Sequence, residues 1–313
     1  MRLAGVRIAA GLLGIFLVLS PPEAAADAAE RSLSFLTYNV HGLFPLIAED
    51  NPRDRSPTIG WLATKYDIVL LQEDFEYHDI IAAQIEHHSS FQGNGMGFDP
   101  RRVAVKIVLF PFQLLLPHFS PPYGAGITAF VDNEFSVDPD VTRKSYDQCY
   151  GWFGANGDCW ARKGFLRVRV RTPEGVEIDV YNTHLEAGSS EESIAVRGGQ
   201  LDDMAAAIET LSSGKGIIVA GDFNLDFRRP GDRRNLLDFR ARLALEDSGA
   251  GPELRFWRDR DYILYRDGPD TTFTVEAAGE AHEFTNRDRA LSDHPALFAR
   301  FHITRHSADG PPQ

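Results

Sequence analysis

The stretch that decides the fold is residues 217–224, which read IIVAGDFN. An apolar, largely β-branched run that ends in Gly-Asp-Phe-Asn predicts a buried strand that runs out into a turn. Side chains alternate along a strand, so we expect Asp222 and Asn224 on the same side at its carboxyl end. A carboxylate and an amide there can position a water, a phosphate or a hard cation, although Asp and Asn after a strand more often make only a turn.

Residues of the same kind recur at the ends of other predicted strands. The segments are 34–39, which ends in Asn39; 67–73, which ends in Glu73; 177–184, which ends in His184; 261–265, which opens with Asp261; and 295–301, which follows Asp293 and His294. So many polar strand ends would be an unusual coincidence if they pointed in different directions. We therefore expect one polar site at one edge of a sheet assembly.

Part of this site has the residue types of a hard-cation site. Mg²⁺ takes oxygen ligands and keeps several waters, so one or two carboxylates and an amide oxygen suffice. Glu73 and Asn39 fit that description, and Cys and His do not occur together at the spacing of a zinc site. The expected cofactor is Mg²⁺, with Mn²⁺ or Ca²⁺ as alternatives.

The other residues indicate acid–base chemistry on water. Asp222 and Asn224 can orient an attacking water, and His184 and His294 carry groups that titrate near neutrality. Asp261 can hold His294 as a carboxylate orients an imidazole in other hydrolases. A metal, a base, a water-positioning pair and an acid together predict metal-assisted hydrolysis of a phosphate ester.

These residues also follow the order of a known motif set. The motifs are Asn39, residues 72–73 (QE), 182–185 (NTHL), 221–224 (GDFN), 261–262 (DY) and 292–294 (SDH). Together they resemble the endonuclease/exonuclease/phosphatase superfamily, which includes pancreatic deoxyribonuclease, inositol polyphosphate 5-phosphatases and neutral sphingomyelinases. The resemblance covers about residues 32 to 303. It implies an α/β (α+β) fold, a four-layered sandwich of two packed mixed β-sheets flanked by helices, with Mg²⁺ dependence and in-line attack by water.

The resemblance implies a role for each matched residue. The implied metal ligands are Glu73, Asn39 and Asp293; the water- and phosphate-positioning pair is Asp222 and Asn224; the base dyad is His294 with Asp261; and His184 stabilises or protonates the leaving side.

One branch of the superfamily is more similar than the others. Residues 158–165, DCWARKGF, resemble the Cys-containing Lys-Gly turn of the sphingomyelinase branch. This implies that Lys163 binds the substrate phosphate, the alternative being a surface lysine beside a disulfide. Secreted bacterial sphingomyelinases that attack membranes carry an aromatic-tipped hairpin before the final Asp-His. Here residues 266–291 are polar, with Phe273 and Phe284 apart, so avid membrane insertion is not expected.

The first residues have the pattern of a secretory signal peptide. Arg2 and Arg7 precede an apolar stretch over residues 8–19 and a small-residue site at 24–26. The apolar part is too short to span a bilayer. We expect residues 1–26 to be removed by cleavage near Ala26, leaving a secreted or periplasmic protein; an uncleaved anchor is the alternative. Residues 27–304 are then one catalytic domain with a lead-in over 27–31, and residues 305–313 are a flexible tail.

The chain has two cysteines, Cys149 and Cys159. An exported protein meets oxidising conditions, so a disulfide closing this small loop is expected, with two free buried thiols as the alternative. The aromatic residues nearby, Trp152, Phe153 and Trp160, either pack over the disulfide or sit at a membrane interface.

The formal net charge of −13 bears on the partner. Non-specific nucleic-acid binding relies on basic patches that neutralise phosphates, and this chain offers only short clusters of Arg. The charge therefore favours a phospholipid or another phosphate ester over nucleic acid, with peripheral membrane contact as one option. The sequence does not specify the oligomeric state.

Local patterns also predict the main elements. Helices are expected over residues 58–66, 76–88, 189–212 and 233–245, and strands over 164–171 and 176–182. Residues 107–116 are either a core strand pair or a lipid-contacting loop.

The leading hypothesis is an exported, Mg²⁺-dependent phosphodiesterase that converts sphingomyelin to ceramide and phosphocholine. A secreted nuclease or a phosphoinositide phosphatase would use the same chemistry on another ester. A binding protein that has lost turnover is the rival from another class, and the full set of motifs argues against it.

Overall fold

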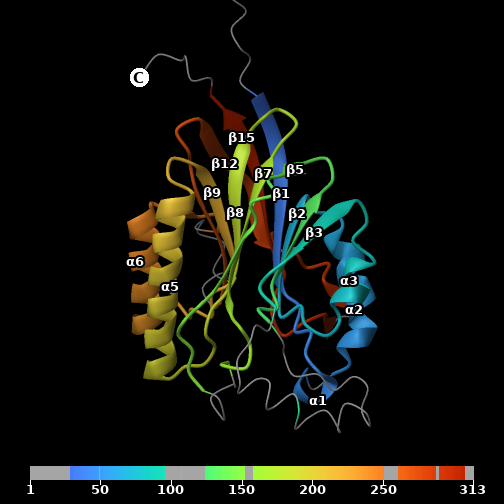
Figure 1. The fold of residues 1–313 in the computed structure, drawn as a ribbon. Coiled ribbons are helices and arrows are strands. Elements are labelled where there is room, and N and C mark those ends of the chain that lie inside the picture. Colours follow the sequence, from blue (N-terminus) through green and yellow to red (C-terminus); the bar gives the residue numbers. More distant parts are fainter. Residues whose placement is uncertain are drawn as a thin grey trace, which may run out of the picture.

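The computed structural model describes residues 29–48, 50–95, 107, 124–151, 158–249, 260–286 and 289–306. Two β-sheets pack face to face, and helices cover the outer face of each sheet (Figure 1). This arrangement confirms the predicted four-layered sandwich. The predicted features over residues 1–26, the aromatic residues 152 and 153, and residues 108–116 lie outside the described residues.

The first sheet is formed mainly by the N-terminal part of the chain and by its last strand. Its parallel pair β1 and β2 is flanked by antiparallel neighbours. The strand order is β12 (Thr271–Glu280), β15 (Leu297–Arg305), β1 (Ala29–Asn39), β2 (Ile68–Gln72), β4 (Thr128–Asp132) and β3 (His88–Gln92).

The second sheet is formed by the middle of the chain and contains the parallel pair β8 and β9. The strand order is β10 (Glu246–Asp247), β11 (Asp261–Arg266), β9 (Gly216–Asp222), β8 (Glu177–His184), β7 (Gly164–Arg171) and β5 (Ser136–Val137), with β6 (Thr142–Ser145) also paired to β7. A small separate ribbon joins β13 (Thr285–Asn286) to β14 (Arg289–Ala290).

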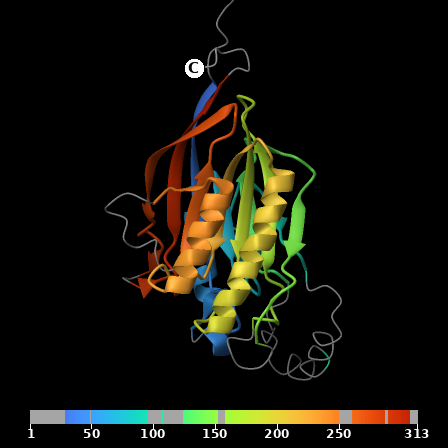
Figure 2. The same cartoon turned by 90° about the vertical axis from the view of Figure 1, so that its left-hand side faces the viewer.

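The helices form the outer layers. α2 (Pro52–Ala63) and α3 (His78–Ala82) lie against the first sheet, near the short α1 (Pro45–Ala48). α5 (Glu191–Leu211) and α6 (Pro230–Leu243) run side by side over the second sheet (Figure 2). The side chain of Ser190 accepts a hydrogen bond from the backbone N–H of Ser193, which caps the start of α5.

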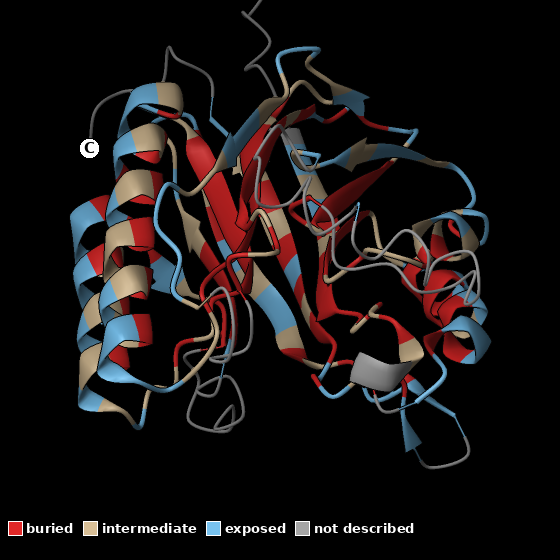
Figure 3. Ribbon diagram, turned by 60° about the horizontal axis from the view of Figure 1, so that its bottom comes forward, coloured by how far each residue is buried: buried red, intermediate tan, exposed pale blue. Residues whose placement is uncertain are grey.

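Three apolar layers hold the four structural layers together. The largest lies between the sheets and includes Phe35 and Ile218. A second packs α5 and α6 onto the second sheet, and a third packs α2 and α3 onto the first sheet. Central strands such as β2, β8 and β9 are accordingly buried along most of their length, whereas the edge strand β3 is largely exposed and the helices bury only their inward faces (Figure 3).

A buried polar contact crosses between the sheets beneath the polar strand ends. Nε2 of Gln72, at the end of β2, donates to Oδ1 of Asn182 in β8 over 2.7 Å. The amide group of Asn182 donates in turn to the carbonyl oxygens of Leu71 and Thr128, each over 2.9 Å. Because buried polar groups need partners, this network fixes how one sheet sits over the other.

Several predicted boundaries need correction. α2 begins at Pro52 rather than at the predicted residue 58, so Pro57 lies inside the helix. The predicted helix over residues 76–88 is limited to α3, because His87 has a left-handed φ of 63° and β3 starts at the next residue.

The predicted lead-in and tail were also drawn too wide. Residues 29–31 belong to β1, and Arg305 belongs to β15, so both termini of the domain are strands paired with each other. The backbone N–H of His306 donates to the carbonyl of Asp270 over 2.8 Å.

The stretch before the final Asp-His has no exposed aromatic pair among its described residues. Phe273 in β12 is buried between the sheets, and Phe284 is buried beside Tyr38 under the first sheet. These buried rings stabilise the sandwich.

Candidate active site

The predicted polar strand ends meet at one edge of the sandwich. In the first sheet, Asn39 of β1 pairs in register with Gln72 of β2, next to Glu73. In the second sheet, Asp222 pairs with His184 on one side and with Asp261 on the other. Parallel strands end at the same sheet edge, and the antiparallel β11 starts there, so the topology brings the predicted residues together.

Asp222 lies at the centre of this group and is almost fully buried. Its Oδ2 accepts a hydrogen bond from Nδ2 of Asn39 over 2.9 Å and lies 3.4 Å from Nε2 of His184. The same oxygen lies 3.8 Å from Nε2 of His294. Burial raises the pKa of Asp222, but the charges of the neighbouring imidazoles outweigh it, so the net pKa is lowered. A buried carboxylate is thus kept ionised at the site.

Glu73 faces Asp222 from the other sheet. Its Oε1 is 4.0 Å from Nε2 of His184, and its Oε2 is 3.3 Å from Nδ1 of His41. Burial opposes ionisation, but the contact with His41 and the charge of His184 lower the pKa of Glu73 to about 2. Glu73 and His41 both have left-handed backbones, with φ of 52° and 47°. Strained, non-glycine backbone of this kind concentrates at functional sites.

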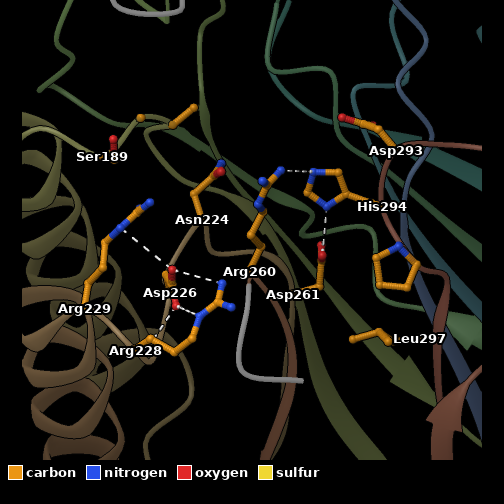
Figure 4. Close-up of a pocket in the computed structure, with 13 residues that line it drawn as sticks. Ser189, Asn224, Asp226, Arg228, Arg229, Arg260, Asp261, Asp293, His294 and Leu297 are labelled. Carbon is orange, nitrogen blue, oxygen red and sulfur yellow. Dashed lines mark hydrogen bonds and ion pairs between the residues drawn. The ribbon is translucent and has the colours of Figure 1, made fainter. Parts of the chain in front are cut away.

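His294 and Asp261 form the predicted dyad. Nδ1 of His294 lies 2.8 Å from Oδ2 of Asp261, and both side chains are about 5% exposed. Burial alone would lower the pKa of His294. The carboxylates of Asp261 and Asp222 raise it by a larger amount, so the net pKa is above the ordinary value. Nε2 of His294 is left facing Asp222 and the pocket (Figure 4).

His184 is in a different electrostatic environment. Its side chain is 2% exposed, and burial together with the charge of Lys163 lowers its pKa. A neutral imidazole donates a hydrogen bond more readily than it gives up a proton. Of the two predicted roles for His184, stabilisation of the leaving side therefore agrees better with its surroundings than protonation.

Three of these side chains converge as ligands would. Oxygen or nitrogen atoms of Glu73, His184 and Asp222 all lie within 4.8 Å of one another. Glu73 and Asp222 are both ionised here, and a cation bound between them would relieve their mutual repulsion. The donor set, rich in oxygen, suits a hard divalent ion. The residues present therefore fit the predicted metal.

The other two predicted ligands are placed less directly. Asn39 lies beside Asp222, but its amide nitrogen faces the carboxylate while its Oδ1 accepts from the backbone N–H of His41 over 2.9 Å. Its oxygen would reach a cation only after a half-turn of the amide. Asp293 is 52% exposed, and its Oδ1 lies 3.3 Å from Nδ1 of His41. Metal binding by these two residues remains a prediction.

Asn224 lies beyond Asp222 in the turn after β9. Its backbone N–H donates to Oδ1 of Asp222 over 2.9 Å, and its side-chain amide donates to the carbonyl of Leu185 over 3.1 Å. Its φ of 51° turns the chain sharply, so that the residue lines the pocket next to His294.

Lys163 is buried beneath the site rather than exposed in it. Its Nζ lies 2.8 Å from Oδ1 of Asp158 and donates to the carbonyl of Leu185 over 2.8 Å. The alternative of a surface lysine is therefore wrong, although contact between Lys163 and a substrate phosphate remains a prediction. The predicted disulfide between Cys149 and Cys159 is confirmed.

Some contacts of the site were not predicted from the sequence. His41, two residues after Asn39, contacts both Glu73 and Asp293. Arg55 of α2 donates to the carbonyl oxygen of His41 over 2.7 Å and to that of Leu291 over 2.8 Å. It thereby links the loop that carries His41 to the loop that carries Leu291. Only the position of His41, two residues after a polar strand end, gave any signal.

A pocket of about 470 Å³ opens beside His294. Arg228, Arg229 and Arg260 line it together with Asn224 and His294 (Figure 4). A terminal nitrogen of Arg260 lies 3.4 Å from Nε2 of His294. The site thus joins a carboxylate-rich centre to a basic pocket.

Comparison with known proteins identifies the family. Residues 36–294 match the Endonuclease/Exonuclease/phosphatase family, and the chain belongs to it. A sphingomyelinase of Mycobacterium tuberculosis is 29% identical over 294 residues, which are 88% of this chain and 54% of the relative. The chain spans about half the length of the curated relatives that it matches.

Solved structures share the fold. Sphingomyelinase C from Streptomyces griseocarneus has a TM-score of 0.57 at 18% identity, over 86% of this chain and 99% of that one. A beta toxin variant from Staphylococcus aureus with bound magnesium ions has a TM-score of 0.59 at 12% identity, over 86% and 99%. None of the helices in the described part of the chain is both long and apolar enough to cross a bilayer.

Proposed function

We propose that this protein is a metal-dependent phosphodiesterase that uses water as the nucleophile. The observation that carries the proposal is the convergence of Glu73, His184 and Asp222 next to the His294–Asp261 dyad. One cluster supplies ligands for a cation, and the other supplies an acid–base group, within a single site whose centre is Asp222. This combination is what hydrolysis of a phosphate ester requires.

The residues divide the chemistry between them. Nε2 of His294 and Oδ2 of Asp222 are 3.8 Å apart, which leaves room for one water oxygen within hydrogen-bonding distance of both. The neutral form of His294, which the raised pKa limits to a small fraction near pH 7, accepts the proton of that water as it attacks phosphorus, and Asp261 stabilises the imidazolium that forms. Asn224 holds a phosphoryl oxygen. Neutral His184 donates a hydrogen bond to the oxygen of the leaving group.

The proposed cofactor is Mg²⁺, held by Glu73 and Asp222, with Asn39 and Asp293 as the further predicted ligands. When bound, such an ion supplies positive charge that stabilises the developing negative charge on the phosphoryl and leaving oxygens. Mn²⁺ or Ca²⁺ would suit the same oxygen-rich site.

Phospholipid diesters are the proposed substrates, with sphingomyelin first because the curated relatives are sphingomyelinases. We further propose that the protein is exported after cleavage near Ala26, which the Cys149–Cys159 disulfide supports. A nuclease or a phosphoinositide phosphatase is the second candidate, because the arginines of the pocket suit an anionic substrate.

Hydrolysis by the purified mature chain tests the proposal. Sphingomyelin vesicles, plasmid DNA and soluble phosphoinositides are incubated in parallel with Mg²⁺ or with EDTA. The proposal predicts Mg²⁺-dependent hydrolysis of at least one substrate, and release of phosphocholine would establish the sphingomyelinase assignment. Absence of turnover on all three, in protein shown to bind Mg²⁺, would favour a binding role instead.

A further inference from the structure

The pocket beside His294 is built from three separate parts of the chain. Arg228 and Arg229 come from the loop after β9, Arg260 immediately precedes β11, and His294 precedes β15 (Figure 4). These segments meet only in the folded protein. The pocket therefore gathers three arginines in a chain whose formal net charge is −13.

Three carboxylates also line the pocket, and each has a partner: Asp226 pairs with Arg228, Asp261 with His294 and Asp293 with His41. Arg228 contacts both oxygens of Asp226, over 2.9 and 3.2 Å. Arg229 lies 3.8 Å from Asp226 and 3.9 Å from Asp232, both beyond hydrogen-bonding distance. Asp232 is itself held by Arg197 over 2.8 Å. Arg229 therefore keeps donors for a ligand.

Arg260 has the most direct position. It is exposed, and within the described part of the chain its guanidinium hydrogen-bonds only to the ring of His294, over 3.4 Å. An anion bound in the pocket would thus meet Arg260 on one side and Arg229 on the other. Guanidinium groups bind phosphate and carboxylate oxygens strongly because two donors point the same way.

The proposed mechanism tells which part of a substrate enters this pocket. The leaving group departs on the side of His184 and Glu73, neither of which lines the pocket. Asn224 and His294, which hold the phosphoryl group and the water, do line it. The substituent that stays on phosphorus therefore faces the arginines.

We infer that the preferred substrate is a phosphodiester whose retained substituent carries a second anionic group, with a second phosphate as the best fit. This inference rests on the proposed phosphodiesterase chemistry and reverses the order of its two substrate candidates, because it places anionic esters before sphingomyelin. A retained choline group is a cation, which the arginines repel, so sphingomyelin is expected to be the poorer substrate of the same site.

Three soluble esters with one leaving group test the inference. Their retained groups are choline, thymidine and thymidine 3′-phosphate, each as the p-nitrophenyl phosphodiester, so p-nitrophenol release reports all three. With Mg²⁺ at low ionic strength, we expect kcat/KM to rise by about tenfold or more from the choline ester to the doubly anionic ester. Added salt should reduce that preference.

Variants of the pocket assign the preference to its residues. Arg260→Gln, and Arg228→Gln with Arg229→Gln, should each lower kcat/KM for the doubly anionic ester by roughly tenfold relative to the choline ester. Arg260→Lys should restore part of the loss. Arg234→Gln removes the same charge from the exposed face of α6, away from the pocket, and should leave the preference unchanged.

The outcomes separate the inference from the function on which it rests. Mg²⁺-dependent hydrolysis of all three esters without a preference, or a preference that survives in the Arg260 and Arg228/Arg229 variants, would overturn the inference but keep the phosphodiesterase. Preference for the choline ester would overturn it as well. Failure to hydrolyse any of the esters, sphingomyelin included, would remove both.

Discussion

Nδ1 of His294 lies 2.8 Å from Oδ2 of Asp261, although the two residues are 33 positions apart. The contact joins the start of a strand in one sheet to the loop before a strand in the other. It leaves Nε2 of His294 directed toward Asp222, and so determines which ring nitrogen can accept a proton from water.

Asp261→Asn should therefore impair catalysis more than folding. Loss of the carboxylate removes a charge that raises the pKa of His294, so the acidic limb of the pH–rate profile should move to lower pH. The poorer base and the unfixed ring should lower kcat by on the order of 10²-fold or more. The pH–rate profiles of the parent and of Asp261→Asn, measured with a soluble diester, give both the position of the acidic limb and kcat. An unshifted limb with full kcat would mean that Asp261 does not act on His294.

Metal binding should depend on Glu73 more than on Asp293. Glu73 faces the centre of the site, whereas Asp293 is half exposed and lies behind His41. We expect Glu73→Gln to weaken Mn²⁺ binding by roughly a hundredfold, and Asp293→Asn by less than tenfold. Calorimetric titration of the two isosteric variants provides a matched comparison. Equal losses would make Asp293 a direct ligand, as its motif indicates.

Glu186 should make stability depend on pH. Burial and the adjacent carboxylate of Asp158 raise the pKa of Glu186 to about 8. Between its unfolded pKa of about 4.3 and that value, the folded protein holds a proton that the unfolded chain releases. The stabilisation that this bound proton gives the folded state is fully present below the unfolded pKa. It is lost as the pH rises toward 8, by at most about 1.4 kcal/mol per pH unit.

Glu186→Gln keeps the shape of the side chain and cannot ionise, so its stability should fall less between pH 5 and pH 8. Urea unfolding at both pH values measures the difference. Glu86→Gln, at an exposed position on the other side of the sandwich, is the control and should behave as the parent. The same pH dependence in all three proteins would show that Glu186 is ionised in the fold at neutral pH.

The contact between Gln72 and Asn182 should stabilise the pairing of the two sheets. Asn182→Ala removes one acceptor of the Gln72 amide and the donor to two buried carbonyl oxygens, which should cost about 2–3 kcal/mol. Replacing both residues with Leu should cost less than the sum of the single losses, because the hydrogen bond between them is then lost only once. Urea unfolding of the four proteins measures the coupling, and additive losses would exclude it.

The sequence predicted the catalytic centre because its signals are local. Asn39, Glu73, His184, Asp222 and Asp261 each stand at a strand end, and parallel strands bring such ends to one edge. The six motifs in order also placed the chain in its family. The two sheets and the long helix α5 followed from periodicity in the same way.

The remaining features depend on how loops fold, which local patterns do not specify. His41 reaches Glu73 and Asp293 only because its backbone is left-handed. The burial of Lys163 depends on its ion pair with Asp158, which lies in a loop that local patterns do not place. The arginine pocket was missed because Arg228 and Arg260 are distant in sequence and meet only across two loops.

The central claim is that His294 activates water in a metal-dependent phosphodiesterase. Its most direct test is hydrolysis of a p-nitrophenyl phosphodiester by metal-stripped parent and His294→Ala proteins as Mg²⁺ is added. The account predicts turnover in the parent only with Mg²⁺, and a loss of 10²–10⁴-fold in the variant although it still folds and binds the ion. Turnover that persists in EDTA, or full activity of His294→Ala, would contradict it.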